Sequence, residues 1–433
     1  MERAARRRHS PIRILSPLRD FLDLEAAGAV LLAASALLAL AWANSPWSHI
    51  YEDLWNSRAA ISIAGHTLDL DLRHWVNDGL MTVFFLIVGL EIKRELTAGH
   101  LASRRAATLP GIAALGGMVV PALIYLVIAG SSAPRGWAIP MATDIALAVG
   151  VLSVAGSRIP SSLRAFLLGL AIVDDIGAIV IIAAVYSTGV LWGWLAAAVV
   201  GLVITILAAR IGVHSMWVYL AIGAMMWFSL HEAGIHPTLA GVAMGLLAPA
   251  TPRSRPDLID GDELTDLSDV HAARATSALA KDSVSVVEWL QHVLHPWTSY
   301  VIVPIFAFAN SGIVISTSGL NAAVRSPITW GVLCGLVVGK PLGVLLATKF
   351  AIKTRLGDKP DDTVPRQIFG VGAAAGIGFT VAIFITELAF DDAVERSNAK
   401  LAILVASLLA AAISSIALTT GAKPARALDN ERS

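Results

Sequence analysis

Two adjacent aspartates, Asp174 and Asp175, lie in the middle of an otherwise apolar run from Phe166 to Tyr186. A helix of about 20 apolar residues is long enough to cross a bilayer. A carboxylate at mid-membrane costs about 2.5 to 3.5 kcal/mol on insertion scales, so two in succession indicate that they are kept for a function. This feature predicts a membrane-embedded ion site.

The composition of the whole chain is that of a membrane protein. Of its 433 residues, 56% are hydrophobic and 15% are charged, and the mean hydropathy is +0.70. These values predict an integral membrane protein whose surroundings are the lipid bilayer. The 32 basic and 32 acidic residues cluster between the apolar runs, so nothing favours a nucleic-acid partner. The single cysteine, Cys334, excludes an intramolecular disulfide and makes a cysteine metal site implausible.

The apolar windows predict an all-α polytopic membrane protein with about twelve transmembrane helices. They lie near residues 25–43, 75–92, 107–129, 137–155, 165–187, 190–209, 215–230, 236–250, 297–315, 328–348, 366–387 and 399–419. With a cytoplasmic N-terminus, 25 of the 32 Lys and Arg lie on cytoplasmic segments, six lie outside, and Lys340 lies within a span. This bias predicts that both termini are cytoplasmic.

The segments outside the spans suggest how the chain is organised. We predict a basic cytoplasmic N-terminus at 1–24, one transmembrane domain at 25–420 and a cytoplasmic C-terminus at 421–433. Residues 61–72 alternate apolar and polar about Gly65-His66, which predicts a short external β-hairpin with an edge suited to a second copy. The polar stretch 251–283 predicts a cytoplasmic loop within the longer interval 251–295 that precedes the ninth span.

Other ionisable residues inside the spans are Asp78, Asp144 and Lys340. Successive helical residues point about 100° apart, so Asp174 and Asp175 face different neighbours. One carboxylate is expected to pair with Lys340, and the other to face a cavity where a cation competes with protons. A purely structural ion pair is the alternative for Lys340.

Two spans carry residues that interrupt helices. Pro140 lacks a backbone N–H and Thr143 offers a hydroxyl, so the span near Asp144 is predicted to be irregular, with the acid compensating exposed helix N-termini. A second span is weakened by four glycines, of which the middle two also fit close helix packing through a GxxxG motif: Gly370, Gly372, Gly376 and Gly378. Interrupted spans at corresponding positions of two halves point to a site at the midplane.

Several long motifs recur in order along nearly the whole chain. They include Gly89-Leu-Glu-Ile-Lys-Arg-Glu-Leu, Met141-Ala-Thr-Asp-Ile, Leu170-Ala-Ile-Val-Asp-Asp-Ile-Gly-Ala, Gly234-Ile-His-Pro-Thr-Leu-Ala-Gly, His292-Val-Leu-His-Pro-Trp, Gly339-Lys-Pro-Leu-Gly and Gly376-Ile-Gly-Phe-Thr. In these motifs the chain resembles the NhaA family of bacterial sodium/proton antiporters. No short chance motif would match so many in sequence.

The resemblance implies a fold of twelve helices built from inverted repeats, in which the fourth and eleventh helices are broken and cross at mid-membrane. It implies that Asp175 is the main ligand of the transported Na+ or Li+ and of protons, and that Asp174 pairs with Lys340. By the same resemblance, Thr143 and Asp144 support the site at the crossing. No cofactor is implied besides the transported ions, and no enzymatic activity.

The resemblance also concerns regulation and assembly. Glu91, His292 and His295 match positions at the cytoplasmic mouth that are associated with activation by alkaline pH. This chain has Gln291 where a glutamate is expected, so its pH threshold is left open. The hairpin matches the dimer contact of the family, and the expected location is the bacterial inner membrane.

The function predicted from the sequence is electrogenic Na+(Li+)/H+ antiport for sodium and pH homeostasis. Carboxylate, hydroxyl and carbonyl oxygens suit such small hard cations. A sodium-coupled symporter of a small organic anion is the alternative, although few buried arginines are available to bind an anion. An intramembrane aspartyl protease would need two facing aspartates on separate helices, and its Gly-x-Gly-Asp sequence is absent.

Overall fold

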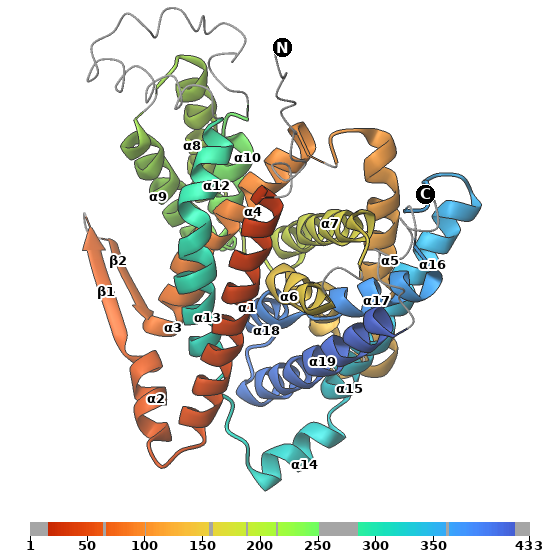
Figure 1. Cartoon of the computed structure of the whole chain (residues 1–433). Coiled ribbons are helices and arrows are strands. Elements are labelled where there is room, and N and C mark those ends of the chain that lie inside the picture. Colours follow the sequence, from red (N-terminus) through yellow and green to blue (C-terminus); the bar gives the residue numbers. More distant parts are fainter. Residues whose placement is uncertain are drawn as a thin grey trace, which may run out of the picture.

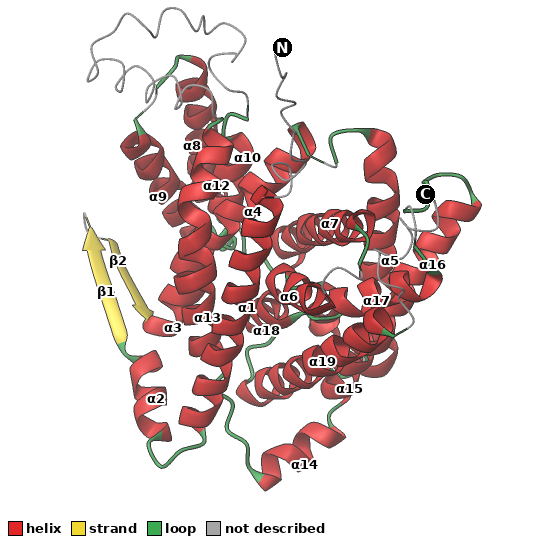
Figure 2. Ribbon diagram, viewed as in Figure 1, coloured by secondary structure: helices red, strands yellow, loops and turns green. Residues whose placement is uncertain are grey.

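The computed structural model describes residues 16–63, 66–99, 101–155, 159–187, 189–213, 215–250, 285–360 and 363–420. The predicted loop at 251–283 and the C-terminal segment 421–433 lie outside these residues, as do residues 1–15 of the predicted N-terminal segment. Within them the fold is helical apart from two strands (Figure 2). Figure 1 labels most of the elements, which follow one another as α1 (Ser16–Ala43), α2 (Ser48–Asn56), β1 (Arg58–Ile63), β2 (His66–Asp71), α3 (Leu72–His74), η2 (Trp75–Leu80), α4 (Met81–Thr97), α5 (Arg104–Ala129), η3 (Pro134–Met141), α6 (Ile145–Ala155), α7 (Ser161–Val185), α8 (Trp192–Arg210), α9 (Met216–Glu232), α10 (Leu239–Leu247), α12 (Val286–Trp297), η6 (Thr298–Ile302), α13 (Val303–Asn310), α14 (Thr317–Arg325), α15 (Pro327–Cys334), η7 (Gly335–Gly339), α16 (Lys340–Lys353), α17 (Pro365–Ala375), α18 (Phe379–Ala389) and α19 (Ala393–Thr419).

Seven helices of the described residues are long and apolar enough to cross a membrane, and up to nine if each of two bent pairs is one span. The bent pairs are α1 with α2, at 114°, and α17 with α18, at 47°. The seven helices and the pair of α17 with α18 coincide with predicted spans. Of the first pair, α1 covers the span predicted near 25–43, whereas α2 lies beyond it. The other three predicted spans, near 215–230, 236–250 and 297–315, fall on α9, on α10 and on the run from α12 to α13.

Helix α12 begins inside the interval that was predicted to be loop up to residue 295. Ser285 Oγ accepts a hydrogen bond of 3.2 Å from Glu288 N–H, and the Glu288 carboxylate accepts one of 3.3 Å from Ser285 N–H. This reciprocal capping box satisfies two backbone donors that a helix start leaves without partners. The helix therefore starts at Val286, about 11 residues before the span predicted from residue 297.

The β-hairpin is present and starts three residues before the predicted segment. Strands β1 and β2 pair antiparallel, with Arg58 opposite Asp71 and Ile63 opposite His66. The indole N–H of Trp75, at the start of η2, donates to Ala59 O at 2.9 Å. The hairpin is thus fixed to the helix that follows it.

The helices form two groups that lie side by side in Figure 1. The first, which we call the hairpin bundle, comprises α1, α4, α8, α9, α10, α12 and α13, with α4 packed on α10 and α12 and with α1 packed on α13. The second, the site bundle, comprises α5, α6, α7 and α15 to α19, with α5 packed on α7, α15 and α16 and with α19 packed on α15, α17 and α18. The bundles meet where α1 contacts α6, α4 contacts α7 and α13 contacts α18.

One end of the molecule, which we call the hairpin face, carries α2, α14 and the link that leads into α19 (Figure 1). Asn44, after α1, donates to Ile313 O at 2.8 Å and accepts from Ile315 N–H at 2.6 Å, which joins the α1–α2 and α13–α14 links. Tyr186, after α7, donates to Arg135 O at 2.7 Å and so joins the end of α7 to η3. Several helices of both bundles therefore end at this face.

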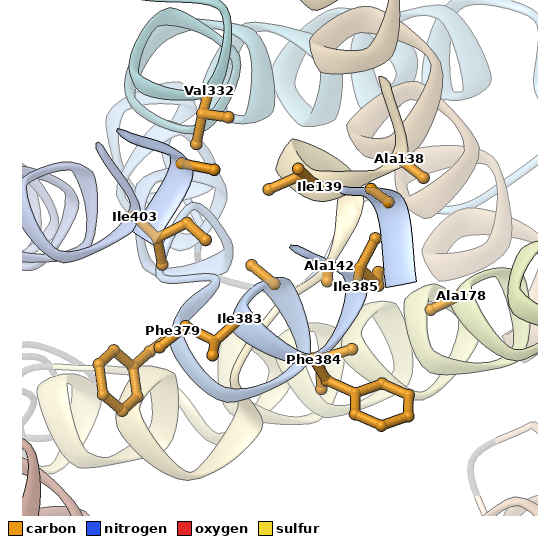
Figure 3. Close-up of a cluster of buried hydrophobic side chains, with 14 of the residues drawn as sticks. Ala138, Ile139, Ala142, Ala178, Val332, Phe379, Ile383, Phe384, Ile385 and Ile403 are labelled. Atoms are coloured by element: carbon orange, nitrogen blue, oxygen red, sulfur yellow. The ribbon is translucent and has the colours of Figure 1, made fainter. Parts of the chain in front are cut away.

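The centre of the protein is apolar and closely packed. Figure 3 shows side chains of η3, α7, α15, α18 and α19 meeting in one cluster, among them Ile139, Val332, Ile383 and Ile403. Gly335 and Gly339 of η7 lie against Pro140 and Pro121, where a Cβ atom would come within 2.6 to 2.8 Å of a proline carbon. Small residues at these points allow the backbones to approach closely, as is common between helices in membranes.

Candidate functional site

Two interruptions of the helices contact one another in the site bundle. Helix η3 ends at Met141 and α6 begins at Ile145, while α17 ends at Ala375 and α18 begins at Phe379. The backbone N–H of Asp144 donates to Ile377 O at 2.6 Å, and the hydroxyl of Thr143 lies 2.9 Å from Ala375 O. Each interruption thus supplies hydrogen-bond partners that the other lacks, as backbone away from water requires.

The Asp144 carboxylate lies at two helix N-termini. Its Oδ1 accepts from Leu147 N–H in the first turn of α6 at 3.1 Å. Its Oδ2 accepts from the N–H and the hydroxyl of Thr380 in the first turn of α18, at 3.0 and 2.7 Å. The side chain is buried, and a negative charge there complements the partial positive charge of both N-termini.

Asp174 and Lys340 form an ion pair that is inaccessible to solvent. Lys340 Nζ lies 2.6 Å from Asp174 Oδ2, and both side chains are 0% exposed. The ammonium also donates to Met141 O, at the C-terminal end of η3, where a positive charge is favourable. Thr143 Oγ1 lies 2.7 Å from the same Asp174 oxygen. Loss of either charge would leave the other buried without compensation.

Asp175 faces elsewhere, as the 100° step between helical neighbours predicts. It lines a cavity of about 70 Å³ together with Thr143, Asp144, Thr380 and Glu91. Among the described residues none forms a hydrogen bond or ion pair with Asp175 that would occupy its carboxylate. The cavity is therefore lined by an acid whose oxygens are available to a small ligand.

The cavity lies between the two bundles. The site bundle contributes Asp144, Asp175 and Thr380, and the hairpin bundle contributes residues of α1, α4, α12 and the following turn. Glu91 of α4 and His295 of α12 line it on the side away from the hairpin face. A relative movement of the bundles would change the surroundings of Asp175 directly.

The remaining predicted residues are less closely associated with the cavity. His292 lies on α12, is exposed and is not among the residues that line the cavity. Gln291 beside it is buried, and its Oε1 has no hydrogen-bond partner among the described residues. The structure thus places two of the three predicted pH-regulating residues at the cavity.

Sequence reasoning missed Thr380 and the pair formed by Glu387 and Lys400. Thr380 was seen only as the end of a glycine-rich stretch, although Gly378 two residues before it signals a helix start. Glu387 and Lys400 lie at the edges of predicted spans, where charged residues are ordinary. No group of three or more His, Cys, Asp or Glu side chains with metal-binding geometry occurs in the part of the chain that the structure describes.

Three features define the class of protein. The chain has helices long enough to span a membrane, two interrupted helices that contact one another, and a buried acid that faces a cavity between the bundles. Together they are typical of a multi-pass secondary transporter of cations. Residues 19–418 match the family described as Na+/H+ antiporter 1, and the chain belongs to this family.

Named relatives agree with the family assignment. The chain is 42% identical to the Na(+)/H(+) antiporter NhaA 2 of Myxococcus xanthus, over 96% of this chain and 93% of the relative. It is 42% identical to the Na(+)/H(+) antiporter NhaA 2 of Sorangium cellulosum, over 92% of this chain and 89% of that protein. It is 40% identical to the Na(+)/H(+) antiporter NhaA of Oleidesulfovibrio alaskensis, over 92% of both chains.

Proposed function

We propose that this protein is an electrogenic Na+(Li+)/H+ antiporter of the bacterial inner membrane. The observation that carries the proposal is the unpaired Asp175 carboxylate at a cavity between two helix bundles, in a chain that belongs to a Na+/H+ antiporter family. Carboxylate and hydroxyl oxygens are the ligands that small alkali cations accept. Asp175 binds either a cation or a proton, because both occupy the same oxygens.

The buried ion pair gives the site its charge balance. Lys340 compensates Asp174, so that Asp175 and Asp144 supply the negative charge that attracts a cation. The hydroxyl of Thr143 lies beside the Asp174 carboxylate, and that of Thr380 lies beside the Asp144 carboxylate. Asp174 exchanges protons together with Asp175, and the pair serves as the cation and proton site.

Exchange follows from alternating exposure of one site. From the cytoplasm the carboxylates release protons and bind Na+ or Li+; the bundles then move relative to each other, and outside the cation is exchanged for protons. The expected twelve-span fold of inverted repeats, with the fourth and eleventh helices broken and crossing, provides the moving part. The excess of Lys and Arg on one side supports cytoplasmic termini and an external hairpin face.

Two protons entering for each sodium leaving would move one net positive charge inward per cycle. The membrane potential would then contribute about 2.3 kcal/mol per 100 mV to sodium export. Sodium could leave the cell even when the outside is more alkaline than the cytoplasm. Flux in proteoliposomes that does not respond to an imposed potential would contradict this electrogenic form.

Regulation by pH and dimerisation belong to the same proposal. Glu91 and His295 line the cavity, and with His292 they would adjust its charge as pH changes. In a two-stranded sheet each strand has an outer edge, and pairing of such an edge with a second copy would join two copies. We propose a homodimer through this contact.

The first experiment measures exchange in everted vesicles from cells that lack other antiporters. Added Na+ or Li+ is expected to collapse a preformed proton gradient with the wild type and not with Asp175→Asn. Asp358→Asn, which changes an exposed acid whose side chain is 76% accessible, should behave as wild type. No collapse with either ion between pH 6 and 9, with the protein present, would exclude antiport and favour the sodium-coupled symporter.

A further inference from the structure

A second buried ion pair lies at the hairpin-face end of α18. Glu387 Oε1 is 2.6 Å from Lys400 Nζ of α19, and the two side chains are 11% and 10% exposed. Arg396, also on α19, places Nη1 3.7 Å from the other Glu387 oxygen. One carboxylate of α18 therefore faces two cations of α19, and it is nearly removed from water.

Helix α18 connects this ion pair to the cation cavity. Its 11 residues span about 16 Å, with Thr380 bonded to Asp144 at one end and Glu387 near the other. Because a helix of this length is stiff, fixing Glu387 also fixes the position of Thr380.

Aromatic packing closes the space between these two ends. The fully buried Phe384 of α18 lies against Phe85, Phe306 and His236, with ring centroids 5.3, 6.3 and 5.0 Å apart. All three partners belong to the hairpin bundle or to its α9–α10 link. The hairpin-face half of α18 is thus the part of the site bundle that separates the cavity from the hairpin face.

Elements beside the hairpin add charge to the cluster. Arg73 of α3 interacts electrostatically with both Glu387 and Lys400, and its Nη2 lies 3.4 Å from Glu52 Oε2 on α2. Arg73 and Lys400 repel each other, so Glu387 is the group that makes their proximity favourable. Its removal would take from Lys400 and Arg396 the carboxylate that they share.

We propose that Glu387 is a positioning residue of the cation site, which clamps α18 onto α19 and holds the site closed to the hairpin face. The proposal rests on the proposed function in one respect, that a single site is exposed alternately to two sides. Breaking the ion pair frees the hairpin-face end of α18, so that water reaches positions next to Phe384 more often. The state in which the cation site is closed to the hairpin face is then less populated.

The test measures how fast a buried cysteine reacts with a membrane-impermeant maleimide applied to the hairpin face. In a Cys334→Ser background, Thr386→Cys places the thiol beside Glu387, where the side chain is 0% exposed and bonds only to Ala382 O of its own helix. Labelling is expected to be slow while Glu387 is present. With Glu387→Gln, labelling should be at least about tenfold faster. The variant leaves Lys400 buried without its partner, which shifts the equilibrium between the closed and open positions of α18 toward the open one by more than about tenfold.

Matched variants separate local opening from general unfolding. Ser414→Cys on α19 is equally buried and lies far along the helix from the clamp, bonded to Gly370 O at 2.9 Å, so it should stay unlabelled in every variant. The exchanged pair Glu387→Lys/Lys400→Glu should restore slow labelling at position 386. Arg105→Gln, which breaks an exposed ion pair with Asp358, should leave the labelling rate unchanged.

Unchanged labelling in Glu387→Gln would overturn the clamp, and so would an equal increase at positions 386 and 414. Failure of the exchanged pair to restore protection would show that attraction between these two charges is not the cause. Labelling needs neither a sodium nor a proton gradient. A wild type without antiport activity would therefore refute the proposed function while leaving this measurement decisive for the clamp.

Discussion

The structure contains two buried carboxylate–lysine pairs with the same separation of 2.6 Å between nitrogen and oxygen, Asp174–Lys340 and Glu387–Lys400. Each pair joins two helices of the site bundle. Their surroundings differ in the sign of the excess charge. Beside Lys340 lie additional carboxylates, whereas beside Glu387 lies a second cation, Arg396.

This difference separates an ion site from a structural contact. Beside the first pair, Asp175 faces a cavity that Asp144 also lines, and its negative charge attracts a cation there. Around the second pair, the excess positive charge repels a cation, and no cavity among those described includes Glu387. A buried ion pair therefore does not mark a transport site unless an uncompensated acid faces a cavity next to it.

The largest effect that distinguishes the two regions is expected for Asp174→Asn. Lys340 would remain charged at a position that is 0% exposed, which should lower the free energy of unfolding by about 3 to 5 kcal/mol. Removing both charges in Asp174→Asn/Lys340→Met should recover most of this stability. The measurement is unfolding of the purified protein in detergent, and equal losses in the single and double variants would show that desolvated charge is not the cause.

A smaller loss is expected for Asp144→Ala. The carboxylate accepts hydrogen bonds at the N-termini of α6 and α18, and each lost cap costs about 1 kcal/mol, so stability should fall by about 2 kcal/mol. Thr380→Val, which removes only the hydroxyl bond, should cost about 1 kcal/mol. The free energy of unfolding of both variants, measured under the same conditions, checks that Asp144→Ala is the more destabilising change. If Thr380→Val were the more damaging change, the double cap would not be the main role of Asp144 in stability.

The smallest effect is expected for a partly exposed pair, Asp71 and His74, whose side chains are 25% and 60% accessible. Asp71 Oδ1 lies 2.7 Å from His74 Nδ1. Burial by itself raises the pKa of the Asp71 carboxyl. Hydrogen bonds from the backbone and ring of His74 outweigh burial, so the pKa is held below its ordinary value of 3.8. Its stabilisation is thus complete above that value and is lost as the pH falls through the lower pKa of the folded state.

Asp71→Asn keeps an N-cap side chain and removes the charge, so it should cost less than about 1 kcal/mol at pH 7. The difference from the wild type should vanish at the lowest pH at which both proteins remain folded. Unfolding measured at the two pH values checks the prediction. A difference that grows on acidification would mean that the sign assigned to the Asp71 pKa is wrong.

Much of the site was predictable because charged residues inside apolar spans are few and expensive. Asp144, Asp174, Asp175 and Lys340 were all identified on that ground, and the structure brings the four together. Thr380 escaped detection, because a threonine in an apolar helix is common and carries no charge. Glu387 and Lys400 escaped because each lies at the edge of a predicted span, where a charge costs little.

The sequence by itself determined that the chain is a helical membrane protein, that two helices are interrupted, and that the two adjacent aspartates face different directions. These conclusions depend on hydropathy, on proline and glycine, and on the angle between neighbouring helical residues, all of which are local. The residue pattern left open which of the two acids pairs with Lys340, and the family resemblance implied Asp174. Only the tertiary structure shows the contact itself, between residues 166 positions apart, and the cavity that Asp175 faces. Which of two neighbouring acids meets a distant lysine depends on the rotation and packing of whole helices, which no local pattern specifies.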